Sequence, residues 1–422
     1  MNYRDVTLKK LQEGRNVFLT GGAGVGKTTI SGWIIDAYEE NAKKVAKLAS
    51  TGMAATLIGG QTLHSFFDFG IASNKVELQK NGKYEIKKKT KKLIASMDLI
   101  VIDEISMVSD TLFDLIELRL KDAGFRGVIL VVGDFLQLPP VVRGNREVFY
   151  AFESTAWKNF NFETIELTQI YRTDDRAFIE LLHHVRFGMI DEAVHNSLNQ
   201  FIKPLPYDLS RFTFLFGKNI SAMKHNRLQL SYIDEELHIK EAQIIKQKKS
   251  ISDTVCERFM QDARIEKSLE LKIGAPVLFS RNAWNYFNGQ RGVIVNIDAV
   301  YVYVQKDDGK VVKLEQIAQS KIEWVEKNID GKHEFIEEEL FRIYQYPIKL
   351  AFAITIHKSQ GMSIENLIIQ TNEIFAPSQF YVALSRASNP KALTLIAPVK
   401  QWYELAFVNV KAMAFVKECD HC

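Results

Sequence analysis

The sequence is poor in cysteine, in long apolar runs and in signal-like segments, and each shortage excludes a class of protein. Three cysteines among 422 residues are too few for a disulfide scaffold and fit a reducing compartment. No apolar run approaches the roughly 20 residues of a membrane span, and residues 1–10 are charged rather than apolar. We therefore expect a cytoplasmic protein of bacterial or phage type, with no membrane partner.

The net charge is also small, at +3, so the chain is not a polybasic coat for nucleic acid. Any basic surface must be local, and the sharpest excess lies in residues 75–92, where Lys87 begins a run of lysines. That run suits either a solvated face or a nucleic-acid contact. The C-terminal Cys-Asp-His-Cys at 419–422 offers too few well-spaced ligands for a convincing metal clip.

Two α/β patterns follow one another along the chain. A length of 422 residues exceeds one core, so we expect two to four domains. Short β-branched runs alternate with helical stretches, which is typical of doubly wound parallel sheets. In the first pattern the strands are 16–20, 45–50, 99–102 and 128–132, with a helix at 27–38. In the second they are 212–216, 350–356, 367–370 and 392–396, with a helix at 220–232.

Two segments interrupt these patterns. Residues 66–97 are polar and Lys-rich, with a turn at Asn81-Gly82, and we interpret them as a small hairpin insertion. From residue 274 to about 344 short strands alternate with turns, and Asp308-Gly309 and Asp330-Gly331 are hairpin signals. This second segment predicts a small β-barrel inserted into the second α/β domain.

The segment Gly21–Thr28 reads Gly-Gly-Ala-Gly-Val-Gly-Lys-Thr and has a strand before it and a helix after it. Glycines let backbone N–H groups turn toward phosphate oxygens, and the helix N-terminus adds partial positive charge. Lys27 would neutralise the β- and γ-phosphates, and the Thr28 hydroxyl would ligate Mg²⁺. The sequence therefore predicts a P-loop that binds a nucleoside triphosphate.

Asp103-Glu104 and Gln137 follow the next two buried strands of the first pattern. An acid at a strand end of this class holds Mg²⁺, and the next carboxylate can polarise the attacking water. Gln137 can hydrogen-bond a γ-phosphate or that water. Taken alone, the paired acids are equally common in solvated turns, and the Gln137 segment also reads as a Pro-terminated loop.

Arg172 and Arg386 are candidate arginine fingers, which stabilise charge in a phosphoryl-transfer transition state. Hydroxyls, amides and an aromatic in residues 51–66 suit contacts with a nucleic-acid backbone and stacking on a base. A helix cap and a core phenylalanine explain that segment equally well. Residues 355–360 carry a similar set, although a lone histidine such as His357 is more often structural.

Taken together, these segments resemble superfamily 1B DNA helicases of the Pif-one and RecD-like group. The motifs of that family, I, Ia and II to VI, are matched in order by Gly21–Thr29, Ser50–Phe66, Val101–Val108, Val131–Val141, Leu167–Arg172, Ala353–Ser363 and Gln379–Arg386. The run Gly-Asp-Phe-Leu-Gln-Leu-Pro-Pro-Val at 133–141 is distinctive of the Pif-one type. The resemblance spans residues 16 to 388, nearly the whole chain.

The resemblance implies an α/β fold with two RecA-like P-loop NTPase domains, a small wedge insertion in the first and an SH3-like β-barrel insertion in the second. We expect the first domain at 1–65 and 98–175, with the wedge at 66–97. The second domain is expected at 176–272 and 346–422, with the barrel at 273–345. Long terminal extensions are missing, so the sequence resembles a bare motor core.

The resemblance also assigns roles to individual residues. ATP would be bound by Gly22, Gly24, Val25, Gly26, Lys27, Thr28, Thr29, Asp103, Gln137 and Gly361. Mg²⁺ would be held by Thr28 and Asp103. Catalytic roles would fall to Lys27, Glu104, Gln137, Arg172 and Arg386. DNA would be contacted by Thr51, Gly52, Thr62, His64, Phe66, Pro139, Thr355, His357 and Lys358.

The implied activity is ATP-dependent 5′→3′ movement on single-stranded DNA with unwinding of duplex or structured DNA. The partners would be single-stranded DNA and its junctions with duplex, and the protein would act as a monomer, or as a dimer on DNA. One departure concerns the base of the nucleotide. The family has an adenine-reading glutamine upstream of the P-loop, and here Gln12 lies unusually close to it, so the resemblance assigns no residue to reading adenine and leaves the strictness of the ATP preference open.

Two other hypotheses compete with a helicase. A P-loop nucleotide kinase or switch GTPase would have one α/β domain and would leave residues 212–400 unexplained. A non-catalytic DNA-binding protein with a degenerate motor would have lost Lys27 or Glu104, and both are present.

Overall fold

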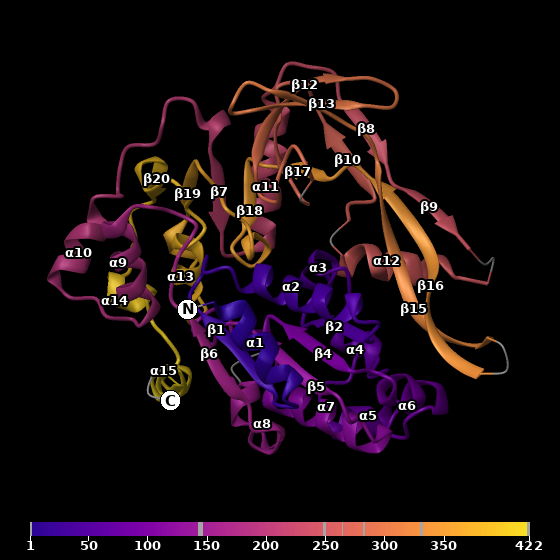
Figure 1. Ribbon diagram of the computed structural model, residues 1–422. Helices are drawn as coiled ribbons and strands as arrows, with labels where there is room; N and C mark the ends of the chain where they lie inside the picture. Colours follow the sequence, from indigo (N-terminus) through magenta and orange to yellow (C-terminus); the bar gives the residue numbers. More distant parts are fainter. Residues whose placement is uncertain are drawn as a thin grey trace.

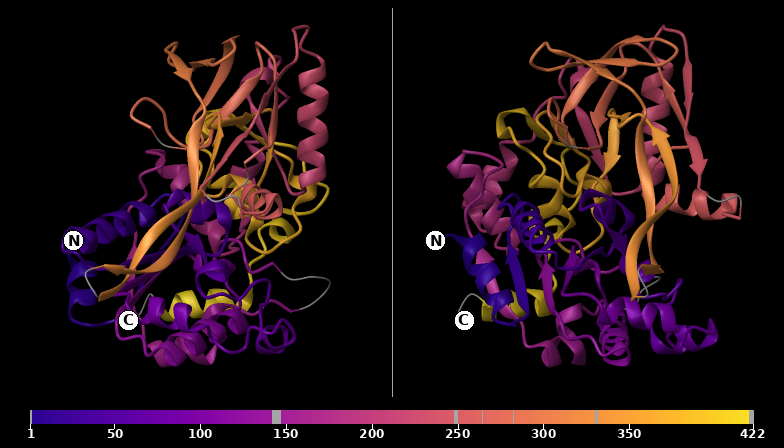
Figure 2. Two further views of the ribbon diagram at one scale, coloured as in Figure 1. Left: turned by 90° about the vertical axis from the view of Figure 1, so that its right-hand side faces the viewer. Right: turned by 45° about the vertical axis from the view of Figure 1, so that its right-hand side comes forward.

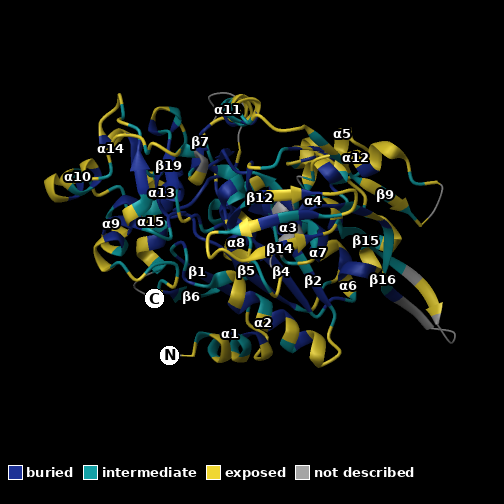
Figure 3. Ribbon diagram, turned by 90° about the horizontal axis from the view of Figure 1, so that it is seen from above, coloured by how far each residue is buried: buried dark blue, intermediate teal, exposed yellow. Residues whose placement is uncertain are grey.

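The computed structural model describes residues 2–141, 147–247, 250–263, 265–281, 283–329 and 332–419. Two helix-flanked sheets lie side by side, and a β-rich unit stands above them with a long arm that descends beside the first sheet (Figure 1). Buried residues concentrate in the sheets, and exposed ones lie on outer helices such as α1 and α10 (Figure 3). None of the helices in these ranges is long and apolar enough to cross a membrane.

The first sheet is parallel throughout and has the order β3-β2-β4-β5-β1-β6. Its strands are Val17–Gly21 (β1), Val45–Ala49 (β2), Gln61–Thr62 (β3), Leu99–Asp103 (β4), Val128–Val132 (β5) and Glu163–Leu167 (β6). Every residue of β1, β4 and β5 is buried. Both faces are therefore covered, as continuous apolar runs in a parallel sheet require. The expected doubly wound first domain is confirmed.

The helices of this domain are Tyr3–Gln12 (α1), Lys27–Glu40 (α2), Gly52–Leu57 (α3), Leu63–Phe66 (α4), Lys75–Lys80 (α5), Lys88–Ala95 (α6), Asp110–Ala123 (α7) and Thr155–Phe160 (α8). The insertion at 66–97 is helical, so the expected hairpin is wrong. Many of its lysines lie on α5 and α6, which bury Leu78 on one helix and Leu93 and Ile94 on the other. The turn at Asn81-Gly82 is present, but it ends a helix.

Arg119 of α7 ties this insertion to the first domain. The guanidinium is 1% exposed and donates to the carbonyls of Phe67 at 3.2 Å, Tyr84 at 2.7 Å and Lys83. Backbone acceptors around a buried arginine fix the segment that carries them, because each lost contact would leave a charged donor unsatisfied. The insertion is therefore held to α7 at its turn between α5 and α6.

The second sheet is also parallel, with the order β18-β7-β19-β20. Its strands are Thr213–Phe216 (β7), Ala353–Thr355 (β18), Leu367–Ile369 (β19) and Leu393–Leu395 (β20). The helices around it are Arg176–Arg186 (α9), Glu192–Asn199 (α10), Asn219–Ser231 (α11), Gln379–Leu384 (α13) and Trp402–Leu405 (α14). The strand expected at 350–356 is two strands, because the chain leaves one sheet for another at Ala351 and Phe352.

The β-rich unit starts earlier than residue 273, which corrects the expected boundary. Its elements are His238–Glu241 (β8), Gln243–Lys246 (β9), Asp253–Asp262 (α12), Ser268–Leu271 (β10), Pro276–Phe279 (β11), Arg291–Ile297 (β12), Val302–Lys306 (β13), Val311–Leu314 (β14), Ile317–Ile329 (β15), Lys332–Gln345 (β16) and Ile348–Leu350 (β17). β8 pairs with β10 and β9 with β16, so these segments belong to the unit by hydrogen bonding. The expected turn at Asp330-Gly331 lies outside the described residues.

Within this unit, β14-β13-β12-β11-β17 form an antiparallel sheet around an apolar core of their own. β17, the last of these strands along the chain, pairs with β11, the first of them, which is the order of a small SH3-like barrel. β15 and β16 form the long arm that reaches the first domain (Figures 1 and 2). Phe335 near the arm's tip is 6% exposed and joins the first domain's hydrophobic core. The arm is therefore packed against that domain rather than projecting into water.

The C-terminal helix Val410–Cys419 (α15) returns to the first domain, so the expected assignment of 346–422 to the second domain is wrong at its end. Ala412 and Val416 lie in the first domain's core. The Phe415 ring contacts the rings of Phe152 at 4.3 Å and Phe135 at 5.4 Å. Apolar residues three and four apart on one helix face explain this docking. Of the suggested metal clip, residues 420–422 lie outside the described residues.

Replacing Phe415 with alanine should therefore destabilise the first domain. We expect a loss of about 2 kcal/mol, below the ~3–5 kcal/mol of a fully buried phenylalanine because this ring is half-buried. Thermal and urea unfolding followed by near-UV circular dichroism would measure it. Tyr403→Ala, at a ring that is 65% exposed, is the matched control. Equal stability of the two variants would show that α15 does not contribute to the core.

Candidate functional site

The loop between β1 and α2 has the backbone of a phosphate-binding turn. Gly24 has φ +79° and Gly26 φ +86°, in the left-handed region that favours glycine. A Cβ on Gly24 would lie 2.9 Å from Cβ of Arg172, and one on Gly21 would lie 2.3 Å from the Leu167 carbonyl oxygen. Gly21 and Gly24 are therefore required by space as well as by conformation, and Gly26 by conformation.

Lys27 opens α2, and its ammonium nitrogen lies 2.8 Å from the carbonyl oxygens of both Gly21 and Gly22. Burial lowers the pKa of this ammonium, while the carboxylates of Asp134, Glu104 and Asp103 act in the opposite direction. The amine is thus held inside the loop, where a phosphate would offer it a stronger charged acceptor than neutral carbonyls do.

Asp103 and Glu104 stand at the carboxyl end of β4. Glu104 has φ +53°, a strained conformation for a residue with a side chain, and its N–H donates to Asp103 Oδ1 at 2.8 Å. Removal from water and the neighbouring Asp103 raise the pKa of Glu104 to about 7. Burial also raises the pKa of Asp103. A carboxyl that is poised near neutral pH suits general base catalysis.

The donor set also fits a divalent cation. The Thr28 side chain is exposed to the cavity described below, and Asp103, which is 7% exposed, lines the same cavity. A buried carboxylate with a raised pKa is stabilised by a nearby cation, and a hydroxyl with a carboxylate is a set that Mg²⁺ accepts alongside phosphate oxygens. The residues expected to hold the metal are therefore compatible with it.

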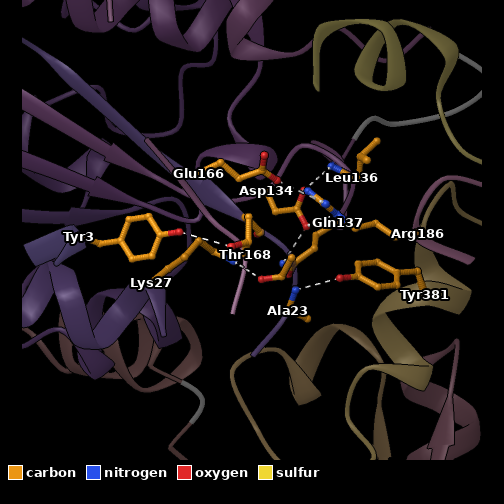
Figure 4. Close-up of polar contacts among 12 residues, drawn as sticks. Tyr3, Ala23, Lys27, Asp134, Leu136, Gln137, Glu166, Thr168, Arg186 and Tyr381 are labelled. Atoms are coloured by element: carbon orange, nitrogen blue, oxygen red, sulfur yellow. Dashed lines mark hydrogen bonds and ion pairs between the residues drawn. The ribbon is translucent and has the colours of Figure 1, made fainter. Parts of the chain in front are cut away.

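A buried ion pair joins the loop after β5 to α9. Arg186 of α9 donates from Nη2 to Asp134 Oδ1 at 3.0 Å and from Nε to Oδ2 at 3.2 Å, with the residues 6% and 1% exposed (Figure 4). The same carboxylate accepts from the Leu136 N–H at 3.0 Å and from Gln137 Nε2 at 3.4 Å. Asp134 thus fixes Gln137 from one side and α9 from the other.

Tyr381 of α13 adds a second link across the two domains. Its hydroxyl lies 2.8 Å from the Ala23 N–H, which donates to it, and Figure 4 shows the ring reaching the loop from the second domain. Burial raises the pKa of this phenol. A backbone N–H of the phosphate loop is therefore engaged by a side chain of the opposite domain.

Arg172 and Arg386 come from distant parts of the chain and lie close together beside the phosphate loop. Arg172 donates to the Ser385 carbonyl at 2.6 Å and to Ser363 Oγ at 3.0 Å. Arg386 donates to the carbonyls of Val382 and Ser359 at 3.0 and 3.2 Å. Burial lowers the pKa of Arg172 to about 10, and burial together with the neighbouring Arg172 lowers that of Arg386 to about 9. Two desolvated guanidinium groups at one point favour an anionic ligand between them.

These groups line one cavity of about 560 Å³ between the two sheets. That volume suits a ligand of nucleotide size. The cavity is lined by Ala23, Gly24, Val25, Gly26, Lys27, Thr28, Thr29, Ile30, Trp33, Asp103, Glu104, Gln137, Tyr171, Arg172, Gly361, Ser363 and Arg386. Every catalytic, nucleotide and metal residue expected from the sequence lines it except Gly22, where a Cβ would lie 3.2 Å from the Tyr381 hydroxyl.

The expected DNA-binding residues fall into two other cavities. Gly52, Thr62 and His64 line one of about 300 Å³, together with α12 and β15 of the inserted unit. Thr355, His357 and Lys358 line one of about 330 Å³ beside the end of α12. Thr51 lies next to the first cavity and caps α3 through an acceptor bond from the Ala54 N–H at 3.2 Å. The two sets thus lie on opposite domains with α12 near both.

Two of the expected DNA-binding residues, Phe66 and Pro139, are buried in this structure. Phe66 is 3% exposed and packs edge-to-face on Phe67 within the first domain's core, so it is not available to stack on a base. Pro139 is buried and lines neither of these cavities. Thr62 caps α4 by accepting from the Ser65 N–H at 3.3 Å. A helix cap and a core phenylalanine are therefore both present.

The inserted unit approaches the first domain at a glycine. A Cβ on Gly52 would lie 2.1 Å from the backbone oxygen of Asp262, the last residue of α12. The Asp262 carboxyl is withdrawn from water, which raises its pKa, and it faces Arg258, Lys321 and His64. An acidic group therefore stands in the cavity where a phosphate contact was expected.

Sequence reasoning missed four residues of the site. Asp134 and Tyr381 were in recognised runs but had no role, and Arg186 and Trp33 carried no signal. Each acts through a contact with a distant part of the chain. The strand-end position of Asp134 was the one usable hint, because strand ends of parallel sheets meet at a ligand site.

Comparison with known proteins gives one consistent result. A family model described as PIF1-like helicase matches residues 3–196, and a model described as helicase matches residues 310–414. An ATP-dependent DNA helicase Pif1 of Campylobacter jejuni is 38% identical over 96% of this chain and 93% of its own length. The Pif1 helicase of Bdellovibrio bacteriovorus is 35% identical over 98% of this chain and 90% of its own.

Solved structures agree with these relatives. The Bacteroides Pif1 in complex with ADP-AlF4 matches with a TM-score of 0.85 at 27% identity, covering 100% of this chain and 97% of that one. The Bacteroides Pif1 bound to single-stranded DNA matches with a TM-score of 0.65 at 26% identity, covering 99% and 96%. The two RecA-like domains expected from the sequence are confirmed by these matches.

The Asp134–Arg186 pair gives a test of how the domains are joined. Asp134→Asn keeps the shape but leaves the Arg186 charge buried without its carboxylate, so we expect a loss of about 3 kcal/mol in the free energy of unfolding. Glu166→Gln is the matched control, since its carboxylate lies 3.7 Å from Arg186 Nη1 and is 27% exposed. We expect that change to cost under about 1 kcal/mol. Urea unfolding measures both, and similar losses would contradict the assignment.

Proposed function

This chain belongs to the PIF1-like helicase family and is an ATP-dependent DNA helicase, and on that premise we propose how it works. It moves 5′→3′ along single-stranded DNA, separates duplex or structured DNA, and hydrolyses ATP in the cavity between its two RecA-like domains. The observation that carries this proposal is the make-up of that cavity. Its phosphate loop and acids come from the first domain, and Arg386 comes from the second.

Hydrolysis follows from the positions of these side chains. The loop N–H groups and Lys27 hold the phosphates, and Gln137, oriented by Asp134, hydrogen-bonds the γ-phosphate or the attacking water. Glu104 accepts the proton of that water. Arg172 and Arg386 stabilise the charge that develops on the transferred group. Mg²⁺, held by Thr28 and Asp103, would neutralise charge on the phosphate oxygens.

Movement along DNA requires that nucleotide binding and release change the relative position of the two RecA-like domains. The Tyr381 hydroxyl accepts from the Ala23 N–H of the phosphate loop, and Arg172, which lines the cavity, donates to the Ser385 carbonyl, so a triphosphate competes with these contacts. We propose that ATP closes the cavity and that hydrolysis and release reopen it, with the two domains gripping the strand in turn. The grips would come from Thr51, Gly52, Thr62 and His64 on one domain and from Thr355, His357 and Lys358 on the other.

The DNA substrate is proposed from the relatives and from the surface. The Bacteroides Pif1 has been solved with single-stranded DNA, and we propose that this chain binds single strands and their junctions with duplex as a monomer. The lysines of α5 and α6 make the 66–97 insertion the candidate for parting the strands. A nucleotide kinase would not explain the second sheet or its arginine in the cavity.

The raised pKa of Glu104 gives a pH test. If Glu104 is the base, kcat/KM for ATP should rise with pH through one ionisation near 7 and level off above it. In the unfolded chain the Glu104 carboxyl has its ordinary pKa of 4.5, whereas in the folded protein its pKa is about 7. Between these two pH values the folded state binds the proton more tightly, so the free energy of unfolding falls as pH rises from 4.5 to about 7. We expect Glu104→Gln to abolish hydrolysis and to flatten this part of the stability profile. Glu40→Gln, at an exposed site, should change neither.

The polarity is tested with duplexes that carry a single-stranded tail on one side. We expect unwinding with a 5′ tail and little with a 3′ tail or blunt ends, and stimulation of the ATPase by single-stranded DNA. Lys27→Ala should abolish hydrolysis and unwinding while it largely spares DNA binding, because it removes a phosphate contact. Lys43→Ala, a paired surface lysine, is the control. Equal unwinding of both tails would overturn the proposed direction, and an ATPase indifferent to DNA would favour a different P-loop enzyme.

A further inference from the structure

Trp33 is an exposed tryptophan at the mouth of the nucleotide cavity. It lies on α2, is 46% exposed, and is one of the residues that line the 560 Å³ cavity. Six residues separate it from Lys27, which places it about 9 Å further along the helix axis. The phosphate groups occupy the Lys27 end, so the Trp33 end is where the rest of a nucleotide extends.

The lining changes character between these two ends. Lysine, threonine, the paired acids, Gln137 and the two arginines surround the phosphate end. At the other end stand Ile30 and Trp33, and Trp33 is 46% exposed. Tyr171 lies beside the phosphate loop, where its N–H donates to the Gly24 carbonyl at 2.9 Å. The Trp33 end thus presents aromatic and aliphatic surface, which suits the flat face of a base.

A carboxamide that could read the edge of a base is missing from that end of the cavity, within the described residues. Gln137 is the carboxamide in the lining, and it is bound to Asp134 on the phosphate side. Gln12, the glutamine upstream of the phosphate loop, is exposed at the last turn of α1 and does not line the cavity. The first turn of α1 is the part that reaches Trp33.

That first turn holds the indole in place. The Arg4 guanidinium carbon lies 5.5 Å from the centroid of the Trp33 ring. Arg4 is not among the residues that line the cavity. A cation over an indole face is attractive and favours the orientation in which the two groups meet. Trp33 is therefore a cavity-lining indole that Arg4 helps to hold in position.

We propose that Trp33 stacks on the base of the bound nucleotide, with Arg4 as its positioning residue. Purine nucleoside triphosphates are then selected by ring area rather than by hydrogen bonds to the base edge. This inference rests on the proposed function, since it concerns the same nucleotide cavity. It adds a consequence that the function alone does not give: ATP and GTP are used with KM values within about fivefold of each other, because stacking is tolerant of base identity.

Steady-state hydrolysis with ATP and GTP tests the proposed stacking. We expect Trp33→Ala to raise KM for both about tenfold, the scale of one base–aromatic stack, with kcat within about twofold. Trp33→Phe should restore most of the loss, and Arg4→Gln should raise KM about threefold. Inorganic tripolyphosphate, which has no base, should inhibit wild type and Trp33→Ala equally. An unchanged KM in Trp33→Ala, or a fall in kcat alone, overturns the proposal.

Binding of ADP in the absence of DNA gives a readout that needs no turnover. We expect ADP to quench tryptophan fluorescence in wild type and in Trp284→Phe, whose replaced ring is 94% exposed outside the cavity. The quenching should vanish in Trp33→Phe even though calorimetry shows that ADP still binds. Quenching that survives in Trp33→Phe overturns the proposal. A wild-type protein that binds ADP but hydrolyses no triphosphate would instead overturn the proposed function.

Discussion

The ion pair between Asp134 and Arg186 is the contact on which the rest of the site depends. A guanidinium and a carboxylate that are both out of water are stable only together, since either one alone would be a buried, uncompensated charge. The pair therefore fixes α9 of the second domain against the strand ends of the first sheet. Gln137 takes its position from the same carboxylate. The Asp134 carboxylate thus fixes both the position of the second domain and the orientation of the Gln137 side chain.

The phosphate end of the cavity could be predicted from the sequence because its chemistry is local. Gly21 to Thr28 are consecutive residues from the end of β1 to the start of α2, Asp103 ends β4 and Gln137 follows β5, and the apolar runs of these strands identify them. Arg186, Tyr381 and Trp33 could not be predicted, because their roles arise only when distant segments meet. Phe66 was assigned to DNA from its neighbours, but it lies in the core. A phenylalanine beside polar residues has the same sequence context in both situations, so the sequence does not distinguish them.

The inserted units show why a turn is easier to predict than the elements that it joins, or the sheet to which a strand belongs. The turn at Asn81-Gly82 was found, but turn residues end helices as readily as they join strands. Residues 350–356 were predicted to be one strand, but they belong to two sheets: Leu350 pairs with β11 and Ala353 pairs with β7. Hydrogen-bond partners, which decide the boundary of a domain, leave no trace in a short apolar run. The early start of the β-rich unit at β8 was hidden for the same reason.

The return of α15 to the first domain has a consequence for how the protein is made. Phe415 and Val416 complete a core whose other members, such as Phe18 and Trp157, leave the ribosome more than two hundred residues earlier. The nascent first domain must therefore wait, with an open apolar groove, while the second domain and the β-rich unit are synthesised and fold. Full stability arrives only after α15 has been synthesised and released. A chain truncated before α15 would keep every nucleotide-binding motif and still lack a finished core.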